Sequence, residues 1–254
     1  MTCGRVDAGL SRRALIAASV ALPLSAARAA AQGEAPFEVH MRRANPASDP
    51  LTVALTFDAC PGAFDWRIAR ALAENSIAAT IFVTGRWLRR NPEALAFLAA
   101  HRDLFALENH GYWHIPPVLG RRRVFGIAAA GDVATVEREA TAGAHAVRTA
   151  WATEPSWYRG ATGFYSRSAL VAILRLGYGV AGYSLNADMG ATLPARAVAG
   201  RIADAVDGSV IVAHINQPHR SSGAGVAAGA LALQARGVRF LRLDQMAPAQ
   251  FRYF

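Results

Sequence analysis

The chain has 254 residues, 53% of them hydrophobic, and a formal net charge of +9 that comes from arginine alone, because the sequence contains no lysine. The arginines are scattered, and their one run, residues 121–123, has no interleaved aromatic residues. The composition therefore gives no support for nucleic-acid binding, and we interpret the charge as a general attraction to anionic polymers of the cell envelope. Of the two cysteines, only Cys60 lies beyond the first few residues, which excludes a disulfide framework within the folded domain.

The first 31 residues have the pattern of an export leader. Arg12 and Arg13 precede an apolar run, and small residues with an Ala-x-Ala pattern follow up to Ala31. This pattern predicts a twin-arginine (Tat) signal peptide that is cleaved after Ala29 or Ala31 and directs the protein to the bacterial periplasm. An uncleaved anchor or a disordered leader is the alternative, although the apolar run is too short to span a bilayer unaided.

Removal of this leader takes away four arginines and one aspartate and lowers the formal charge from +9 to +6. The remaining stretch of about 220 residues suits one domain with a substantial core. It contains no further apolar segment of membrane-spanning length, so we expect no integral membrane segment in the mature chain.

After the leader, residues 32–50 contain Pro36, Pro46 and Pro50 and predict an extended N-terminal segment. From residue 51 onward, β-rich runs alternate with helical patterns. The expected strands are residues 51–57, 79–83, 104–108, 157–159, 179–184, 209–213 and 238–243. The expected helices begin at Trp66 and at Asn91-Pro92, and cover residues 132–151, 166–176, 194–206 and 225–235.

Strands that alternate with helices predict an α/β fold with a parallel sheet and helical crossovers. With about seven such units, we expect residues 51–254 to form a single (β/α) barrel, a distorted, seven-stranded TIM-like barrel. In barrels of this kind the functional groups lie at the carboxyl ends of the strands. The fold prediction therefore directs attention to the residues that follow each strand.

Five polar residues stand at these positions. Each alone has a structural explanation, as a cap, an ion-pair partner or a satisfied core histidine. Together they indicate an enzyme. Several charged groups clustered at one end of a barrel add nothing to its stability, so they are expected there only if they take part in catalysis. The five residues are Asp58, His110, Arg159, Asp188 and His214.

His110 and His114 stand four residues apart, just beyond the apolar run 104–107. If this run is a strand and the histidines open the following loop or a first helical turn, both imidazoles can face one divalent metal ion. A third ligand, a base and an acid must then come from other strand ends.

Five segments of the chain, in the order in which they occur, resemble the motifs of the polysaccharide deacetylases of carbohydrate esterase family 4, the nodulation-protein-B-like domain. The resemblance covers about residues 51–245, and its first two elements are fairly specific in combination. The segments are Thr56-Phe57-Asp58, His110-x3-His114, Arg159–Gly163, Asp188 and Val212-Ala213-His214.

The resemblance implies a role for each matching residue. Asp58 matches the catalytic base, which takes a proton from the metal-bound water that attacks the acetamide carbonyl, and Arg159 matches the arginine that orients this base. His214 matches the acid that protonates the departing amine, and Asp188 matches the carboxylate that holds and tunes this histidine. Amide cleavage needs such groups in any case, namely an activated water, an electrophilic centre and a proton for the leaving nitrogen.

His110 and His114 match the family's two histidine ligands for the metal, but the sequence departs from the family elsewhere. Ala59 replaces the second aspartate, which completes the metal triad, and Cys60 replaces the glycine usual at the next position. The aromatic residue expected after the tuning aspartate is Met189, and the proline expected after the arginine of the third motif is missing. Two histidines alone hold a catalytic ion weakly, because such zinc sites normally have three protein ligands.

Three residues are candidates for the missing ligand. Asp58 directly follows the strand, and we expect it to ligate the metal and to serve as the base as well. Asp65 is better explained as the cap of the helix that starts at Trp66, and Cys60 as a small buried thiol.

We therefore expect an exported hydrolase of non-peptide C–N bonds, with zinc as its divalent metal. Its expected reaction removes N-acetyl groups from a polysaccharide that contains N-acetylglucosamine, either peptidoglycan or an exopolysaccharide. A hydrolase of another amide or of a cyclic imide is the first alternative. A catalytically inactive carbohydrate-binding relative is the second, which Ala59 favours and the survival of the other site residues disfavours. The expected partner is the N-acetylated polysaccharide and not nucleic acid, and the sequence gives no indication of the oligomeric state.

Overall fold

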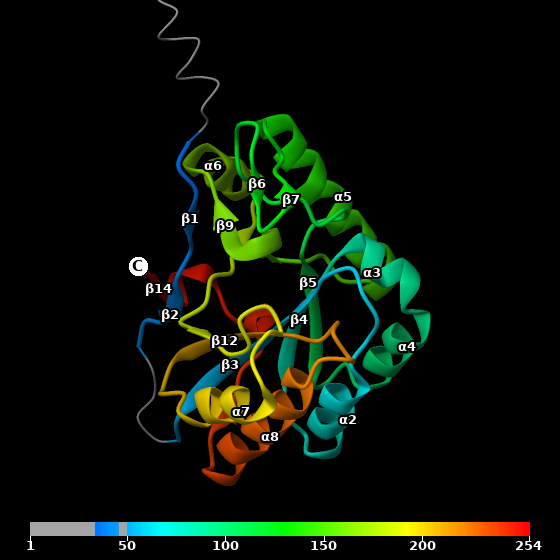
Figure 1. Ribbon diagram of the computed structural model, residues 1–254, viewed down its shortest axis with the longest axis vertical. Helices are drawn as coiled ribbons and strands as arrows, with labels where there is room; N and C mark the ends of the chain where they lie inside the picture. Colours follow the sequence, from blue (N-terminus) through cyan, green and yellow to red (C-terminus); the bar gives the residue numbers. More distant parts are fainter. Residues whose placement is uncertain (1–33, 46–49) are drawn as a thin grey trace, which may run out of the picture.

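The computed structural model describes residues 34–45 and 50–254, so the expected signal peptide lies outside the described residues. Figure 1 shows helices packed around a curled central sheet, with strands and helices alternating along the chain. This arrangement confirms the predicted α/β fold class. The helices are α2 (Trp66–Glu74), α3 (Gly85–Arg90), α4 (Pro92–Ala100), α5 (Val133–Trp151), α6 (Arg167–Arg175), α7 (Ala195–Ala203) and α8 (Ser222–Ala235).

Six strands run parallel in the centre of the main sheet. Their spatial order is β10-β8-β5-β4-β3-β12, and every neighbouring pair is parallel. Because the strands are parallel, all six carboxyl ends lie at one end of the sheet. These strands are β3 (Thr52–Ala59), β4 (Ala79–Val83), β5 (Phe105–Asn109), β8 (Trp157–Tyr158), β10 (Gly179–Val180) and β12 (Ser209–His214).

One segment, residues 179–186, joins the two sides of this parallel sheet. Its start, β10, pairs with β8, and its end, β11 (Leu185–Asn186), pairs with β12. Between them an added Cβ on Gly182 would lie 2.2 Å from the carbonyl oxygen of Val39. Of the expected strand 179–184, only Gly179–Val180 is a strand, and β11 begins just beyond it at Leu185.

Within the described residues the main sheet contains ten strands, so the expected count of seven is not confirmed. The additional strands include β2 (Met41–Arg43), which pairs antiparallel with β12 and with β14 (Phe251–Tyr253). β13 (Arg239–Phe240), which lies within the expected strand 238–243, pairs with the start of β3. β2, β11 and β14 lie outside the expected strands, because each has only two or three residues and carries little periodicity.

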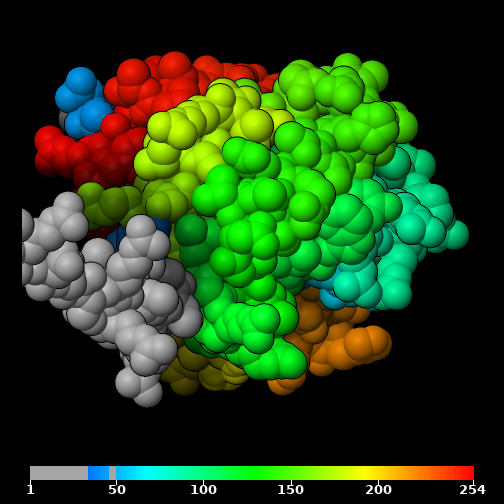
Figure 2. Space-filling model, turned by 90° about the horizontal axis from the view of Figure 1, so that it is seen from above, coloured from blue at the N-terminus to red at the C-terminus, as the bar shows by residue number. Residues whose placement is uncertain are grey.

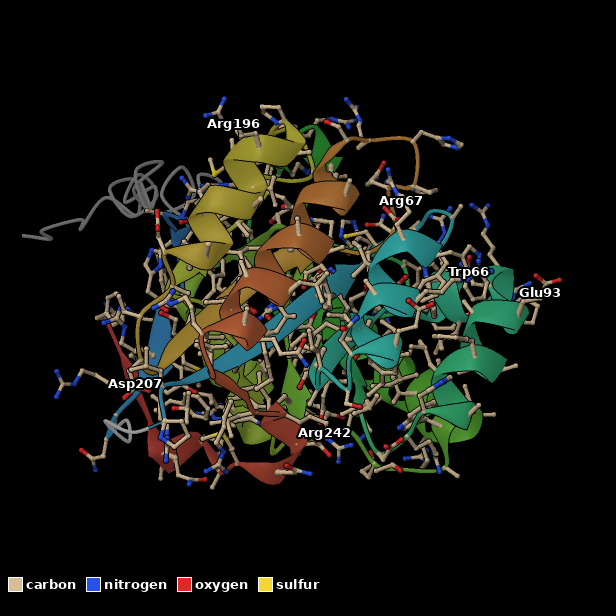
Figure 3. All side chains as sticks on the ribbon, turned by 90° about the horizontal axis from the view of Figure 1, so that it is seen from below. Trp66, Arg67, Glu93, Arg196, Asp207 and Arg242 are labelled. Carbon is tan, nitrogen blue, oxygen red and sulfur yellow. The ribbon has the colours of Figure 1, made fainter. Side chains whose placement is uncertain are left out.

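Helices cover one side of the parallel strands. In Figure 3, α7 and α8 lie side by side with α2 next to α8, and the labelled charged residues lie around the outside. The two helices approach closely because α8 has glycine at the contact, where an added Cβ on Gly225 would lie 2.2 Å from the carbonyl oxygen of Ala195.

The alternation of side chains along each strand divides the core into two layers. On β3, Leu55, Phe57 and Ala59 belong to the large apolar cluster under the helices. Ala54 belongs to a smaller cluster inside the curl of the sheet. Asp58 has the same parity as Ala54, so its side chain faces the inside.

Short elements near the N-terminal segment complete the described fold. β9 (Phe164–Tyr165) pairs with β1 (Phe37–Glu38), and β6 (Arg123–Val124) forms a hairpin with β7 (Ile127–Ala128). In Figure 2 the green residues of this hairpin region and of α5 cover the middle of the face. Three short 3-10 turns are η1 (Ala161–Gly163), η2 (Leu243–Gln245) and η3 (Pro248–Gln250).

Glu108 on β5 is a buried acid that does not line the cavity of the site described below. It accepts hydrogen bonds from the backbone N–H of Trp157 at 2.8 Å and from the hydroxyl of Ser156 at 3.3 Å. Burial is the main cause that raises the pKa of Glu108 to about 8, from an ordinary value of 4.5. The folded protein therefore favours the neutral carboxyl group, and folding stability falls as the pH rises from about 4.5 to about 8.

We expect Glu108→Gln to remove this part of the pH dependence. Above about pH 8 the variant should be more stable than the wild type by on the order of a few kcal/mol, since one pKa unit corresponds to about 1.4 kcal/mol. The measurement is urea unfolding at a series of pH values. Glu93→Gln, at an exposed position on α4, is the control and should leave the pH profile unchanged, and parallel profiles for the wild type and Glu108→Gln would contradict the prediction.

Candidate active site

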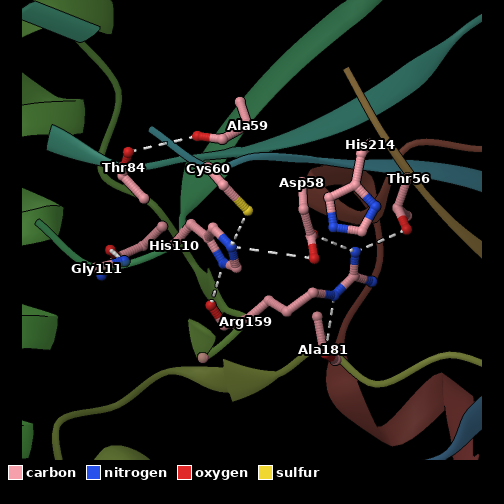
Figure 4. A network of polar contacts seen from close by, with 12 residues as sticks. Thr56, Asp58, Ala59, Cys60, Thr84, His110, Gly111, Arg159, Ala181 and His214 are labelled. Carbon is pink, nitrogen blue, oxygen red and sulfur yellow. Dashed lines mark hydrogen bonds and ion pairs between the residues drawn. The ribbon is translucent and has the colours of Figure 1, made fainter. Parts of the chain in front are cut away.

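The five polar residues expected at the strand ends lie together in the structure. Figure 4 shows Asp58, His110, Arg159 and His214, and Asp188 is hydrogen-bonded to His214. Asp58 of β3 and His214 of β12 are register partners on adjacent strands. His110 directly follows β5 and Arg159 directly follows β8, while Asp188 comes shortly after β11. The parallel sheet thus brings residues from separate parts of the chain to one end.

Arg159 is buried at the centre of this group, with 1% of its surface exposed. Its Nη1 donates to Oδ1 of Asp58 at 3.0 Å and to Oγ1 of Thr56 at 2.9 Å. Its Nε and Nη2 donate to the carbonyl oxygens of Ala181 at 3.2 Å and Gly182 at 3.1 Å. A buried charge is tolerated when it is paired and hydrogen-bonded, and this guanidinium is both.

Asp58 is a carboxylate with two different surroundings. Burial raises the pKa of Asp58, but the charges of His110 and Arg159 together outweigh it, so the pKa lies below its ordinary value. Oδ1 is bonded to Arg159, whereas Oδ2 lies 4.0 Å from Nε2 of His110. Arg159 therefore holds one oxygen and leaves the other turned toward the histidines.

His214 is paired with the fully buried Asp188. Oδ1 of Asp188 lies 3.0 Å from Nδ1 of His214, and Oδ2 accepts the backbone N–H of the same histidine at 2.7 Å. Because a carboxylate only accepts, Nδ1 carries the hydrogen in this bond. Burial lowers the pKa of His214, but the bond to Asp188 and the neighbouring Cys60 outweigh it, so the pKa lies well above its ordinary value.

His110 and His114 meet in a loop and not in a helical turn. Their ring centroids are 5.1 Å apart. Nδ1 of His110 donates to the backbone carbonyl of Arg159 at 2.6 Å, which leaves Nε2 directed at the site. His114 has a φ of 68°, in the left-handed region that non-glycine residues rarely adopt. Such backbone strain is concentrated at functional sites.

Glu139 of α5 holds this histidine loop, and the sequence analysis missed it. Its carboxylate accepts the backbone N–H groups of Trp113 at 3.0 Å and Ile115 at 3.1 Å. Burial raises the pKa of Glu139, although these bonds oppose the shift. A signal was present, because Glu139 lies between Val136 and Ala140 on the apolar face of an amphipathic helix, and a buried acid on such a face requires a polar partner.

Asn109 ties the same loop directly to the α5 backbone. Its Nδ2 donates to the carbonyl of Ala140 at 2.8 Å, and its Oδ1 accepts the N–H of Gly111 at 2.9 Å. An added Cβ on Gly143 of α5 would lie 2.2 Å from this Oδ1 and 2.6 Å from the backbone of Gly111. The helix therefore packs against the loop with no room for a side chain at this point.

Cys60, His110 and His114 form a possible metal site within the described residues. Their ligand atoms all lie within 4.8 Å of one another, and Sγ of Cys60 is 3.5 Å from Nε2 of His110. Nε2 of His114 is buried and has no hydrogen-bond partner, as expected of an atom whose partner is an ion. A thiolate with two imidazoles is a donor set that suits zinc, so the residues fit the metal that the family resemblance implies.

The setting of Cys60 differs from that of the inert buried thiol expected from the sequence. Burial raises the pKa of its thiol, but the charges of His114 and His110 outweigh it, so the pKa lies well below its ordinary value. Burial lowers the pKa of His110 in turn, but Asp58 and Cys60 outweigh this effect and raise it. A thiolate of this kind is available as a ligand or as a nucleophile.

The other two residues singled out near the first motif have structural roles. Ala59 is fully buried in the apolar cluster under the helices. Asp65 caps α2, as expected, because it accepts the backbone N–H of Arg67 at 3.1 Å and pairs with the same residue's guanidinium at 2.6 Å. The carboxylate of Asp65 is therefore occupied by Arg67 and is not directed at the histidines.

The site opens into a cavity of about 420 Å³ that Asp58, Cys60, His114 and His214 help to line. Phe125, at the turn between β6 and β7, stands at its rim with 77% of its surface exposed. This volume is typical of pockets for small molecules or for one unit of a polymer. No helix among residues 34–45 and 50–254 is long and apolar enough to cross a membrane.

Residues 45–181 match the polysaccharide deacetylase family. The matched region includes Asp58, both histidines of the loop and Arg159, and it ends before Asp188 and His214. It covers more than half of the 254 residues. No curated protein matches the sequence.

Three solved structures illustrate the fold similarity. A family 4 carbohydrate esterase from Streptomyces lividans is 20% identical with a TM-score of 0.63, over 79% of this chain and 95% of its own. A peptidoglycan deacetylase from Bacillus subtilis is 19% identical with a TM-score of 0.64, over 78% of this chain and 91% of its own. A pseudoenzyme of carbohydrate esterase family 4 from Bacillus anthracis is 17% identical with a TM-score of 0.61, over 80% of this chain and 67% of its own. At these identities the similarity shows a common fold.

The contact between α5 and the histidine loop leads to a test with a matched control. A glycine-to-alanine change in a helix normally stabilises a protein by about 0.5–1 kcal/mol. We expect that gain for Gly200→Ala in α7, where an added Cβ meets nothing within 4 Å. We expect Gly143→Ala to destabilise the protein by roughly 1–3 kcal/mol, because the Cβ must displace Asn109 and the loop backbone. Urea unfolding of both variants measures the difference, and a gain in stability for Gly143→Ala would contradict the packing described here.

Proposed function

The chain belongs to the polysaccharide deacetylase family, and from this premise we propose that it is an exported, metal-dependent hydrolase that removes N-acetyl groups from a polysaccharide containing N-acetylglucosamine. The observation that carries the proposal is the pairing of Asp58 with Arg159 and of His214 with Asp188, with Asp58, Arg159 and His214 lining one cavity. Peptidoglycan is the first candidate substrate, since a solved structure with this fold is a peptidoglycan deacetylase. An exopolysaccharide is the second.

Asp58 is suited to be the general base. The oxygen that Arg159 does not hold is turned toward the histidine pair, where an attacking water must lie. Deprotonation of that water allows its oxygen to form a bond with the acetamide carbonyl carbon. Arg159 keeps the carboxylate ionised and correctly oriented during this step.

His214 is suited to be the general acid. Its Nδ1 is engaged by Asp188, so Nε2 is the atom that can reach a substrate in the cavity. As the C–N bond breaks, Nε2 gives its proton to the departing amine, and acetate and the free amino sugar are the products. The raised pKa of His214 keeps it protonated before this step.

His110 and His114 would hold the divalent ion. When bound, a zinc-like ion polarises the carbonyl and lowers the pKa of a neighbouring water. Nδ1 of His110 is bonded to a backbone carbonyl, an arrangement that fixes the tautomer in which Nε2 can donate to a metal.

Two observations favour a second candidate, a carbohydrate-binding relative without catalysis. Ala59 stands where the family has its second aspartate, and one of the solved structures with this fold is a family 4 pseudoenzyme. Hydrolysis of another amide or of a cyclic imide is the remaining alternative. Binding of glycan without release of acetate distinguishes the non-catalytic relative from both hydrolases.

We expect the purified full chain to release acetate from N-acetylglucosamine oligomers or from peptidoglycan. A chelator should abolish the release, and added zinc should restore it. Asp58→Asn and His214→Ala should each lower the rate about 10²- to 10⁴-fold, the usual contribution of a general base or acid. Enzymatic quantification of acetate measures all of these rates.

Matched control variants are available for both changes. Asp204→Asn removes an exposed carboxylate beyond α7, and His145→Ala removes an exposed imidazole on α5. Both should retain the wild-type rate. The proposal fails if the wild type releases no acetate from either substrate, or if Asp58→Asn and His214→Ala are as active as the controls.

The cellular location of the protein is a separate part of the proposal. The Arg12-Arg13 pair and the Ala-x-Ala pattern support Tat export to the periplasm, with residues 51–254 as the catalytic domain. Replacement of both arginines by lysine keeps the charge but removes the twin-arginine signal. We expect this variant to stay in the cytoplasm as a longer precursor, whereas the wild type appears in the periplasmic fraction without its leader, as detected by immunoblot.

A further inference from the structure

We propose that Cys60 is the third protein ligand of the metal site and supplies, through its thiolate, the contact that Ala59 cannot make. This proposal adds a ligand to the site of the proposed function. It rests on that function in one respect, because it requires that the chain bind a divalent ion at His110 and His114. It replaces our sequence-based expectation that Asp58 is the third ligand.

Strand alternation provides the first support. Side chains two residues apart on a strand share a face. Cys60 directly follows β3 and has the same parity as Asp58, while Ala59 between them packs in the apolar cluster under the helices. Asp58 and Cys60 therefore reach the site together, and the side chain at position 59 turns to the opposite layer.

The spacing of the ligand atoms provides the second support. A tetrahedral zinc site with normal bond lengths places a thiolate sulfur and an imidazole nitrogen about 3.5 Å apart. Sγ of Cys60 lies 3.5 Å from Nε2 of His110. The ligand atom of His114 completes a group of three within 4.8 Å. The group forms from side chains alone, with no rearrangement of the sheet.

The surroundings of the two histidines provide the third support. Nδ1 of His110 donates to a backbone carbonyl, so Nε2 is the nitrogen left for a ligand role. Nε2 of His114 is buried with no hydrogen-bond partner. A buried nitrogen in that condition is costly unless another atom satisfies it. An ion bound by Cys60 and His110 would also satisfy His114.

Asp58 is the less suitable third ligand. Its Oδ1 is committed to Arg159, and its Oδ2 is 4.0 Å from Nε2 of His110. With Cys60 as the ligand, Asp58 remains free to accept a proton. Metal binding is then the role of Cys60 and proton transfer the role of Asp58, so that Asp58 does not have to combine both.

This ligand set has a consequence for metal choice. A thiolate is a soft donor that favours zinc or cobalt over magnesium and calcium, whose sites are built from oxygen. We therefore expect zinc to bind and magnesium to compete poorly. A carboxylate at the same position would discriminate less between these ions.

The test uses the full chain with Cys3→Ser, so that Cys60 is its single thiol. Cobalt(II) is the spectroscopic probe, because a cobalt–thiolate bond produces a charge-transfer absorption in the near ultraviolet that oxygen and nitrogen ligands do not. Zinc affinity is measured by competition with a chromogenic chelator. The variants compared in this background are Cys60→Ser, Asp58→Asn and, as a control for metal binding, His114→Ala.

We expect the charge-transfer absorption in the parent chain and in Asp58→Asn, and its absence in Cys60→Ser. Zinc affinity should fall by at least about 100-fold in Cys60→Ser. Loss of a residue that only hydrogen-bonds a metal ligand lowers affinity by about 10- to 100-fold, and loss of a ligand itself should cost at least as much. It should fall less than about 10-fold in Asp58→Asn. Loss of zinc in Asp58→Asn with normal binding by Cys60→Ser would overturn the proposal, as would a parent chain without the absorption.

A second measurement needs no substitution at the site itself. In the Cys3→Ser chain, zinc should slow alkylation of Cys60 by iodoacetamide at least about 10-fold, because a coordinated thiolate is no longer a free nucleophile. An equal alkylation rate with and without zinc would contradict the proposal. Unfolding of the metal-free variants in urea identifies any variant whose fold is damaged.

These readouts separate the inference from the proposed function. If zinc binds through Cys60 and no acetate is released, the ligand assignment stands and the deacetylase proposal fails. If Cys60→Ser keeps both its zinc and its acetate release, the deacetylase proposal stands and the ligand assignment fails.

Discussion

The buried guanidinium of Arg159 is the interaction on which the arrangement of the site depends. It bonds Asp58 of β3 and the carbonyl groups of Ala181 and Gly182, and its Cζ lies 4.2 Å from the ring centre of Phe82. A charge at this depth costs several kcal/mol unless these partners are present. The same contacts that satisfy the charge therefore join β3 to the segment that links the two sides of the parallel sheet. One guanidinium both orients a carboxylate and is hydrogen-bonded to the segment that joins the two sides of the sheet.

The alternation along β3 assigns neighbouring residues to opposite layers. Asp58 and the following Cys60 face the cavity, whereas Ala59 contributes to the packing under the helices. Adjacent residues at the end of β3 therefore have different roles, one set lining the cavity and the other packing in the core. This geometry explains how a chain without the family's second aspartate can still present a potential ligand beside His110 and His114.

The histidine loop depends on α5 as much as on β5. Glu139 binds the loop's backbone N–H groups, and Asn109 joins the loop to the helix backbone. Gly143 lets the helix approach to this distance. A loop held in this way can keep His114 in a left-handed conformation that the loop by itself would not favour. The positioning of two histidines is thus a property of the helix–loop contact.

The sequence by itself determined the described helices except α3, most of the parallel strands, the cap at Asp65 and the strand ends at which polar residues gather. Periodicity, capping and strand-end position are local properties of the chain. It did not determine the ten-stranded main sheet, the partner of Glu139 or the third atom near the histidines. Those depend on which distant segments meet, since Cys60 and His110 are separated by 50 positions and Glu139 and Trp113 by 26. Spacing along a chain does not specify distances across a sheet, and only the tertiary structure brought these groups into contact.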